Sequence, residues 1–452
     1  MIEKIKNLLP AEQIIDGKSE QAKPFLTEKR GNFKSHCTMI VMPKSVDEAS
    51  KVVTFCYNNN ISIVPQSGNT GLVGGAVASN NQIILSSRLM NSVIEIDKKN
   101  FSITTESGVT LRDLQKYAEK EGLYFPLSLP SENNCLIGGN LATNAGGISV
   151  LKYGNSRDLC LGLEVILPNG EIYSDLNKLR KRNIGSDLKH LFIGSEGTLG
   201  FITKASLKLF PKPNKIINVL IFLDSIEQSE EYFQKIYSKY SALLSSFELF
   251  NQNALDLVKK FNNIKYLQNS HYPWYIIMSF DIPEDNHNIK EFIDSITKND
   301  YILTEDDNIW DCRYLIPDSQ SNYGQSLKHD ISTPLSDTIN FIKKSLADLE
   351  QKYPNKLMPI IFGHMGDGNL HFNISKKENA SFDLAEIKKE IKQIILQNVI
   401  ELGGSFSSEH GVGLIHKEEF KKFYFTNQYN KLKLIKNTLD KNNIFNPNKI
   451  LD

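Results

Sequence analysis

The residues best suited to chemistry lie in two short motifs towards the end of the chain. GHMGDGNLHFNI carries His364 and His371, and SSEHGVG carries Glu409 and His410. Two imidazoles and a carboxylate form a ligand set that suits Zn²⁺ or a similar divalent ion with open coordination positions. Hydrogen-bonded hairpin histidines are the alternative, but the glycine turn between the histidines and the Glu-His pair downstream favour a metal site.

Three further segments are rich in glycine and small polar residues: PQSGNTGLVGGAV (65–77), PSENNCLIGGNLATNAGG (130–147) and GSEGTLGFIT (194–203). Glycine lets backbone N–H groups turn towards a ligand and lets a diphosphate approach closely. The first segment matches neither the GxGxxG nor the Walker A pattern, so an ordinary surface turn is its alternative interpretation. None of the three contains a nucleophile–base pair. Together they predict a long phosphate-containing cofactor wrapped by several turns.

Local patterns predict the elements that position these loops. They indicate helices over 45–60 and 110–122, beginning at Ser45 and Thr110, and short strands over 61–66, 81–87, 94–97 and 101–107. The last two strands are expected to form a hairpin. Mixed helices and short antiparallel strands favour an α+β fold over a doubly wound fold.

The composition changes around 205–215, where prolines and lysines mark a boundary. Beyond it the patterns predict strands over 218–223, 274–281, 358–363 and 370–375, and helices near 226–240, 287–298, 334–353 and 382–404. The last two strands flank the MGDGN turn as a hairpin. Side chains two apart on a strand share a face, so His371 and Asn373 face the same way and His364 can point into the same cleft.

Composition narrows the possible functions. The 452 residues predict two or three domains, and 52 Lys+Arg balance 52 Asp+Glu, so no net charge favours nucleic acid or an anionic membrane. The sequence has no apolar run long enough for a transmembrane helix and no secretory signal at its start. Its cysteines are odd in number and widely spaced, which predicts buried thiols, a reducing compartment and a cytoplasmic location.

The three loops and the segment KLRKRNIGSDLKHLFIGSEGTLGFIT (178–203) resemble vanillyl-alcohol oxidase/PCMH-type flavoproteins of the D-2-hydroxyacid dehydrogenase branch. That branch includes D-2-hydroxyglutarate dehydrogenase, FAD-linked D-lactate dehydrogenase and the glycolate oxidase flavin subunit. The resemblance covers residues 35–452. It implies a PCMH-type FAD-binding domain over 1–211 and an α+β substrate (cap) domain of the FAD-linked oxidase C-terminal type over 212–404. A C-terminal segment, 405–452, should pack back towards the flavin.

The resemblance also implies which residues bind the cofactor. The FAD is expected to be noncovalent, because the first loop contains neither a histidine nor a cysteine, although Cys135 lies in the second loop. The residues carried over for FAD are Pro65, Ser67, Gly68, Asn69, Thr70, Gly71, Gly74, Ser131, Gly138, Gly139, Asn144 and Ile202.

For the substrate site, the resemblance implies that His364, His371 and Glu409 bind a divalent metal, zinc or manganese, and that His410 is the base. Oxidation of a 2-hydroxyacid needs a cation for the carboxylate. Arg313 and Lys328, with Asn373, are the residues carried over for that purpose. Pro317 stands where hydroxyglutarate enzymes have a threonine, so one contact to a distal carboxylate is missing.

The expected reaction is oxidation of a D-2-hydroxyacid, of the D-2-hydroxyglutarate or D-lactate class, to the 2-oxoacid. Hydride would pass to the flavin and electrons then to an external acceptor, such as an electron-transfer flavoprotein or a quinone. For the oligomeric state, the sequence is compatible with a homodimer. Two alternatives remain at this point: a metal-dependent hydrolase that uses the His/His/Glu set, and a flavin-binding subunit that is active only in a complex.

Overall fold

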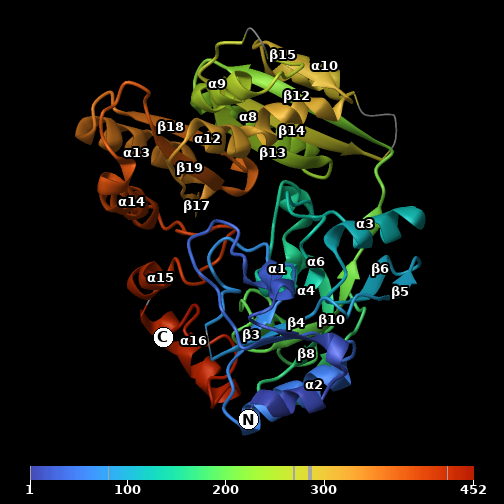
Figure 1. Cartoon of the computed structure of the whole chain (residues 1–452). Coiled ribbons are helices and arrows are strands. Elements are labelled where there is room, and N and C mark those ends of the chain that lie inside the picture. The colour runs from blue at the N-terminus through green and yellow to red at the C-terminus, as the bar shows by residue number, and fades with distance from the viewer. Residues whose placement is uncertain (1, 80, 268–269, 284–287, 425) are drawn as a thin grey trace. The chain divides into compact units, whose positions relative to one another are not determined.

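The computed structural model describes residues 2–79, 81–267, 270–283, 288–424 and 426–452 (Figure 1). The chain divides into two compact units. The first comprises Met1–Gly147, Gly154–Lys212 and Glu409–Asp452, and the second comprises Ile148–Tyr153 and Pro213–Ser408. The sequence placed boundaries after residues 211 and 404, whereas the units divide after Lys212 and Ser408, and the second unit also takes in Ile148–Tyr153.

The first unit contains a mixed sheet and an antiparallel sheet (Figure 1). The mixed sheet has the order β1 (Ile14–Asp16), β2 (Met39–Val41), β4 (Ile83–Ser86), β3 (Ile63–Gln66). The antiparallel sheet has the order β5 (Val93–Asp97), β6 (Ser102–Glu106), β10 (Phe201–Lys208), β8 (Cys160–Ile166), β9 (Ile172–Asp175).

Helices α2 (Val46–Asn58) and α3 (Leu111–Lys120) begin where the sequence predicts. Ser45 accepts a hydrogen bond from the backbone N–H of Glu48, and Thr110 does the same for Asp113, so each hydroxyl satisfies an amide that the first helical turn leaves unpaired. Short elements of this unit are η1 (Ile2–Asn7), η2 (Ala11–Gln13), η3 (Glu20–Ala22), α1 (Lys23–Leu26), β7 (Leu123–Tyr124), α4 (Ile137–Ala142), α6 (Ser156–Leu159), α7 (Lys189–Phe192) and β11 (Phe210–Pro211).

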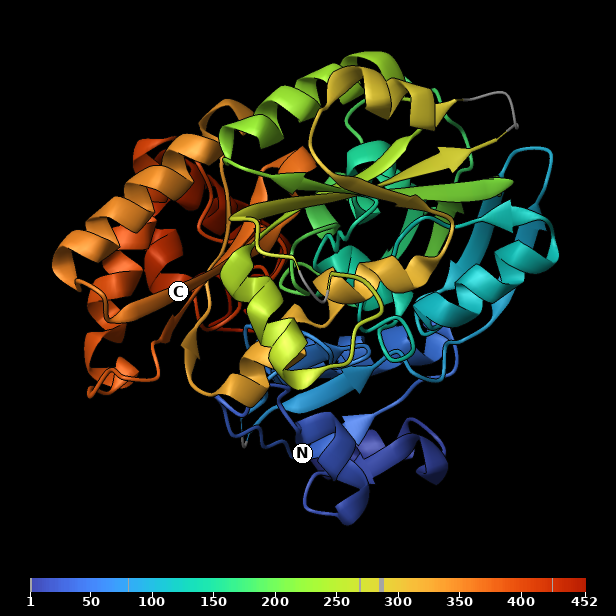
Figure 2. The same cartoon turned by 90° about the horizontal axis from the view of Figure 1, so that it is seen from above.

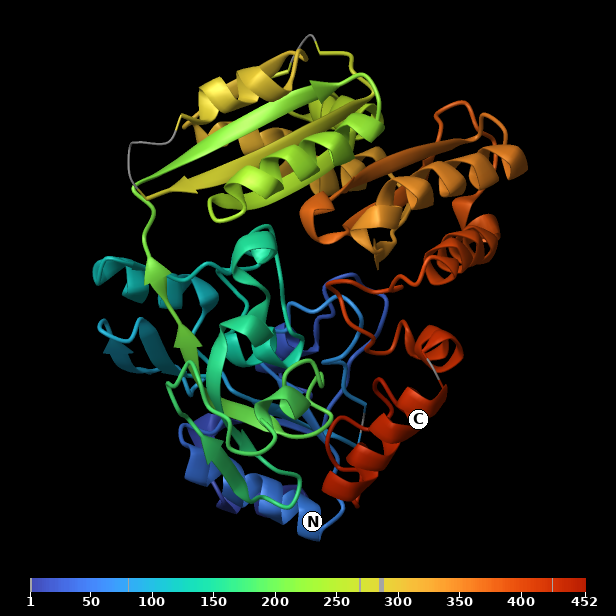
Figure 3. The same cartoon turned by 180° about the vertical axis from the view of Figure 1, so that it is seen from behind.

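The C-terminal residues belong to the first unit, where α15 (Lys417–Phe423) and α16 (Thr426–Leu439) lead to a partly buried tail (Figure 3). Ile444 and Phe445 are buried in the core formed by α2 and the mixed sheet, and Phe445 bridges to Ile63 of β3. Lys436 donates to the carbonyls of Thr198 (2.8 Å) and Phe445 (2.7 Å). The tail is therefore fixed beside the third glycine loop.

The second unit is built on an antiparallel sheet whose faces are both covered by helices (Figures 2 and 3). Its order is β15 (Tyr301–Thr304), β12 (Lys215–Leu223), β14 (Trp274–Ile282), β13 (Leu244–Asn251), β18 (Leu357–Gly363), β19 (Asn369–Lys376), β16 (Ser326–Leu327), and β17 (Asp330–Ser332) also pairs with β19. Alternate strand residues enter different cores: Met278 contributes to one and its neighbour Ile277 to the other.

The two faces carry different helices. The face of Met278 packs against α8 (Glu227–Tyr240), α10 (Ile289–Ile296), α13 (Thr338–Lys352) and α14 (Leu384–Glu401). The face of Ile277 packs against α9 (Gln252–Phe261), α11 (Asp311–Tyr314) and α12 (Ile316–Tyr323). Short elements are α5 (Val150–Tyr153), η4 (Asp307–Trp310), η5 (Leu335–Asp337) and η6 (Met365–Asp367).

The predicted α+β class is confirmed, and the hairpin around the MGDGN turn forms as β18, η6 and β19. The helix expected over 287–298 is α10, which begins at Ile289 after its cap Asn288; residue 287 lies outside the described residues. Strand β13 and the elements before residue 27 did not follow from the sequence patterns. All five cysteines are buried and free. Within the described part of the chain, no helix has the length and apolarity to cross a bilayer.

Candidate functional site

The three glycine segments line a common cavity in the first unit. Residues from segments 65–76, 135–143 and 195–202 surround it, together with His410. The residues predicted to bind FAD that line it are Pro65, Ser67, Gly68, Asn69, Thr70, Gly71, Gly138, Gly139 and Ile202. Gly74, Ser131 and Asn144 are not among the lining residues.

Close backbone packing explains part of the glycine pattern. A Cβ on Gly68 would lie 2.3 Å from the carbonyl oxygen of Asn134, and a Cβ on Gly138 would lie 2.7 Å from the Cβ of Ser107. A side chain at either position would force the loops apart, because real Cβ contacts are never that short. Asn144 has a structural function in this packing: it adopts a left-handed φ of 51° and accepts a hydrogen bond from the backbone N–H of Arg157 at 3.0 Å.

The cavity has polar groups suited to a nucleotide cofactor. Asn140 is 5% exposed and Gln66 2% exposed, and both line the cavity. Within the described residues, the amide nitrogen of Asn140 and the amide oxygen of Gln66 have no hydrogen-bond partner. A buried polar group without a partner is costly, so both atoms suit a ligand that supplies the complementary group. Asn140 was not among the predicted residues, although it stands inside the GGNLATNAGG motif.

Cys135 also lines the cavity, and it is buried. Burial raises the pKa of its thiol above the ordinary value. Because the thiolate is the nucleophilic form, this environment disfavours attack by Cys135 on a bound cofactor.

Replacing Gly71 by Val is expected to weaken FAD binding by roughly tenfold or more, about 1.4 kcal/mol, without destabilising the apoprotein. A Cβ on Gly71 meets no protein atom within 4 Å, so the added side chain extends into the space that the cofactor needs. Isothermal titration with FAD and thermal unfolding of the apoprotein test both statements. Gly68→Val is the contrast: its contact with Asn134 should lower the melting temperature itself, and a similar loss of stability in both variants would contradict the argument.

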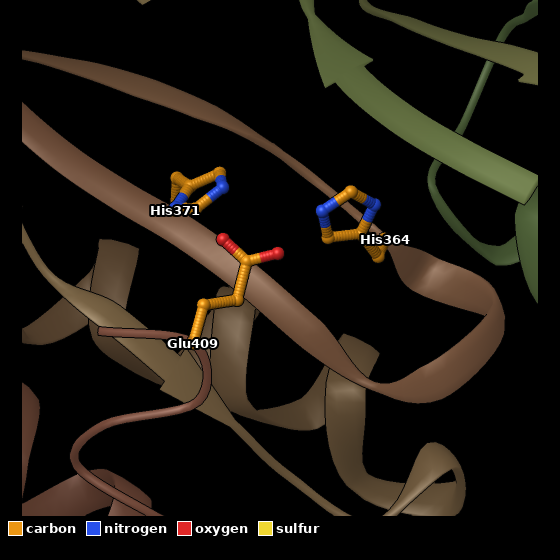
Figure 4. A group of neighbouring side chains, drawn as sticks. All are labelled: His364, His371 and Glu409. Atoms are coloured by element: carbon orange, nitrogen blue, oxygen red, sulfur yellow. The ribbon is translucent and has the colours of Figure 1, made fainter. Parts of the chain in front are cut away.

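The predicted metal ligands come together at the hairpin of the second unit (Figure 4). His364 precedes η6, His371 lies on β19, and Glu409 directly follows Ser408, the last residue of that unit. Their ligand atoms all lie within 4.8 Å of one another. Two imidazoles and one carboxylate at this spacing fit a divalent ion and leave coordination positions for other ligands.

Glu248 on β13 orients His364, and no sequence motif pointed to it. In the register of β13 and β18, Leu249 opposes Gly363, which brings the next pair, Glu248 and His364, together. The Glu248 carboxylate bonds to Nδ1 of His364. If Nδ1 donates its proton to this carboxylate, Nε2 keeps the lone pair that a metal needs, which is the common carboxylate–histidine arrangement around metal sites. The available signal was a single acidic residue in the fully buried strand LSSFELFN.

Arg313 completes this buried group. Its Nε donates to the second carboxylate oxygen of Glu248 at 2.7 Å, and its guanidinium lies 4.7 Å from the centroid of the Phe362 ring. Burial by itself would raise the pKa of Glu248, but the charges and hydrogen bonds of His364 and Arg313 outweigh it and lower the pKa to about 2. Glu248 is therefore ionised at any physiological pH.

The other predicted substrate residues occupy different environments. Lys328 is exposed between β16 and β17. Asn373 is buried; its side chain accepts from the backbone N–H of His329 at 3.1 Å and donates to Gln320 at 2.9 Å. Nδ1 of His329 bonds to the carbonyl oxygen of Phe372 at 2.9 Å. Pro317 lies at the start of α12, one helical turn after Arg313.

Glu248→Gln is expected to reduce metal affinity by roughly 10–100-fold, as loss of an outer-shell carboxylate typically does. It should also lower the free energy of unfolding by about 3 kcal/mol, because Arg313 would keep a buried charge without its ionic partner. Metal titration and urea unfolding measure the two effects. The control is Glu231→Gln on α8, which removes an exposed pair with Lys235 and should change stability by about 0.5 kcal/mol or less. Equal effects in the two variants would contradict the role of Glu248.

Comparison with known proteins identifies the family. Residues 37–175 match the model of an FAD binding domain, and residues 212–450 match that of the C-terminal domain of FAD linked oxidases. The chain belongs to the FAD-linked oxidases. The D-2-hydroxyglutarate–pyruvate transhydrogenase of Saccharomyces cerevisiae is 32% identical over 99% of this chain and 93% of its own length. The D-2-hydroxyglutarate dehydrogenase of Danio rerio is 34% identical over 91% of this chain and 78% of its own length.

The solved structures agree on the fold of this FAD-linked oxidase. A crystal structure of p-cresol methylhydroxylase with substrate bound matches with a TM-score of 0.77 at 16% identity, covering 100% of this chain and 96% of that one. The expected PCMH-type FAD-binding domain, followed by an FAD-linked oxidase C-terminal domain, is confirmed. The first two glycine segments therefore lie within the matched FAD binding domain, as the resemblance implied, and the third lies in the same compact unit.

Proposed function

We propose that this FAD-linked oxidase oxidises a D-2-hydroxyacid to the 2-oxoacid. The observation that carries the proposal is the joint presence of an FAD-binding domain and a clustered His364/His371/Glu409 set, with His410 adjoining that set in sequence and lining the cofactor cavity. Relatives named for D-2-hydroxyglutarate support the same substrate class. Membership of the FAD-linked oxidases argues against the metal-dependent hydrolase.

The residues divide the chemistry between them. Bound FAD supplies a hydride acceptor, and a bound divalent ion supplies positive charge where the substrate hydroxyl loses its proton. His364, His371 and Glu409 would hold the ion, with Glu248 keeping His364 in its ligating orientation. His410 takes the hydroxyl proton on an imidazole nitrogen.

We propose that the FAD is held noncovalently. The first loop offers no histidine or cysteine, and the raised pKa of Cys135 disfavours its thiolate. Binding then depends on the loop amides and on Asn140, whose side-chain nitrogen suits a cofactor acceptor. Acid treatment should release all of the flavin from the protein.

Two residues near the predicted substrate site bear on the size of the substrate. Arg313 is already paired with the carboxylate of Glu248. Pro317, at the start of α12, offers neither a hydroxyl nor an N–H. We therefore propose that the enzyme favours a short D-2-hydroxyacid of the lactate class over a five-carbon diacid. The ratio of kcat/KM for D-lactate and D-2-hydroxyglutarate decides this.

The deciding experiment is a dye-reduction screen of D- and L-2-hydroxyacids with the purified protein and added zinc or manganese. Reduction of the flavin by a D-enantiomer supports the proposal. A protein that binds FAD but is reduced by no 2-hydroxyacid would overturn it. Turnover of the dye by the isolated chain would exclude a subunit that works only in a complex. The physiological acceptor we propose is an electron-transfer flavoprotein or a quinone.

A further inference from the structure

The carboxylate of Glu196 reaches the residues that directly follow His410. One of its oxygens accepts a hydrogen bond from the backbone N–H of Val412 at 2.7 Å, and the other accepts from Gly413 at 2.9 Å. Glu196 lies in the third glycine loop, and all of these residues belong to the first unit. A carboxylate that bonds two successive amides fixes the direction of the backbone between them.

The GVG sequence after His410 fits this contact closely. Gly411 has a left-handed φ of 83°, and a Cβ there would lie 2.6 Å from the Glu196 carboxylate. Gly413 has a φ of 50°, and its Cβ would lie 2.3 Å from the carbonyl oxygen of Val73 in the first glycine loop. That same carbonyl accepts from the backbone N–H of Leu414 at 2.8 Å. The turn is thus packed between the first and third loops, with no room for a side chain at position 413.

The backbone of Glu196 is itself held by hydrogen bonds to two other segments. Its φ is 50°, its backbone N–H donates to the carbonyl of Ala142 in the second loop at 2.8 Å, and its carbonyl accepts from Asn446 at 2.8 Å. Asn446 also donates to the carbonyl of Gly75 at 2.9 Å. Glu196 therefore links the three cofactor loops and the C-terminal tail to the turn that carries His410.

We propose that Glu196 is the positioning residue of His410, fixing the turn at 411–413 so that the imidazole stays directed at the cofactor cavity. This role rests on the proposed function, because it assigns His410 a proton to take. Both residues line the cavity. Burial raises the pKa of Glu196 to about 7, although the two amide hydrogen bonds act to lower it. The fold therefore holds this carboxyl group in a position that destabilises its ionised form.

The test compares Glu196→Gln with Glu171→Gln, which alters an exposed carboxylate between β8 and β9 of the same unit. Glutamine offers one acceptor oxygen, and its NH₂ group faces the second amide without being able to accept from it. FAD content, KM and the rate of substrate-driven flavin reduction are measured for both variants. We expect Glu196→Gln to keep its FAD and a KM within about twofold, and to lose roughly 10–100-fold in rate, as small misplacements of catalytic groups do.

A double-mutant cycle separates positioning from general support of the fold. If Glu196 acts through His410, then Glu196→Gln should change the residual rate of the His410→Ala enzyme by less than about twofold. Hydrogen exchange supplies a readout that is independent of activity: the amides of Val412 and Gly413 should exchange faster in Glu196→Gln than in the wild type or Glu171→Gln.

Each outcome bears on a different statement. An unchanged rate in Glu196→Gln, or an equal loss in the presence and absence of His410, overturns the positioning role. Unchanged exchange at Val412 and Gly413 overturns the contact on which the role depends. A wild-type protein that binds FAD but is reduced by no 2-hydroxyacid overturns the proposed function, and the role with it, whatever the exchange data show.

Discussion

Replacing His410 by Ala is expected to slow flavin reduction by substrate roughly 10²–10⁴-fold, the typical contribution of a general base. FAD should stay bound, because His410 is one residue among the many that line the cavity, and the loop amides remain in place. Stopped-flow measurement of flavin absorbance after mixing with a D-2-hydroxyacid gives the rate directly. Photoreduction of the same variant should proceed normally, since it bypasses the proton acceptor.

The control for this variant is His271→Ala, which removes an exposed histidine of the second unit and should leave the rate unchanged. His371→Ala should behave differently from His410→Ala: it should lose metal first, and rate as a consequence. Should His410→Ala reduce its flavin at the wild-type rate, the base lies elsewhere. His329 would be the next candidate, although its Nδ1 already bonds to the carbonyl of Phe372.

Removal of the proposed metal by a chelator should lower turnover by roughly 10³-fold or more, because an ion that stabilises developing negative charge contributes several kcal/mol. The flavin spectrum should change little, since the His364/His371/Glu409 set and the glycine loops are separate groups of residues. Zinc or manganese should restore activity. Metal analysis before and after chelation, paired with the dye assay, measures both quantities.

Glu409→Gln sharpens this experiment. The amide keeps the size of the side chain but removes the charge that a divalent ion favours, so metal content and turnover should fall together. Glu418→Gln changes an exposed carboxylate on α15 and should alter neither. Full activity in a preparation shown to contain no metal would contradict the metal site altogether.

Much of the local structure could be predicted from the sequence, because its causes are local. Hydroxyl caps at Ser45 and Thr110 set the starts of α2 and α3 through bonds to amides three residues away. The glycine turn between His364 and His371 defines the hairpin that brings both histidines together. The glycine loops could be located for the same reason, since the backbone conformations they need are encoded in the residues themselves.

The sequence did not reveal the residues that hold the chemical groups in place. Glu248 meets His364 because β13 pairs with β18, and the two residues are 116 positions apart. Glu196 meets Val412 across 216 positions, and Asn446 meets Gly75 across 371. Strand order and the packing of a C-terminal tail depend on the burial of complete helix and sheet faces. A short sequence motif carries no information about that burial. The sequence by itself determined which residues could perform the chemistry, and the tertiary structure decided which distant residues orient them.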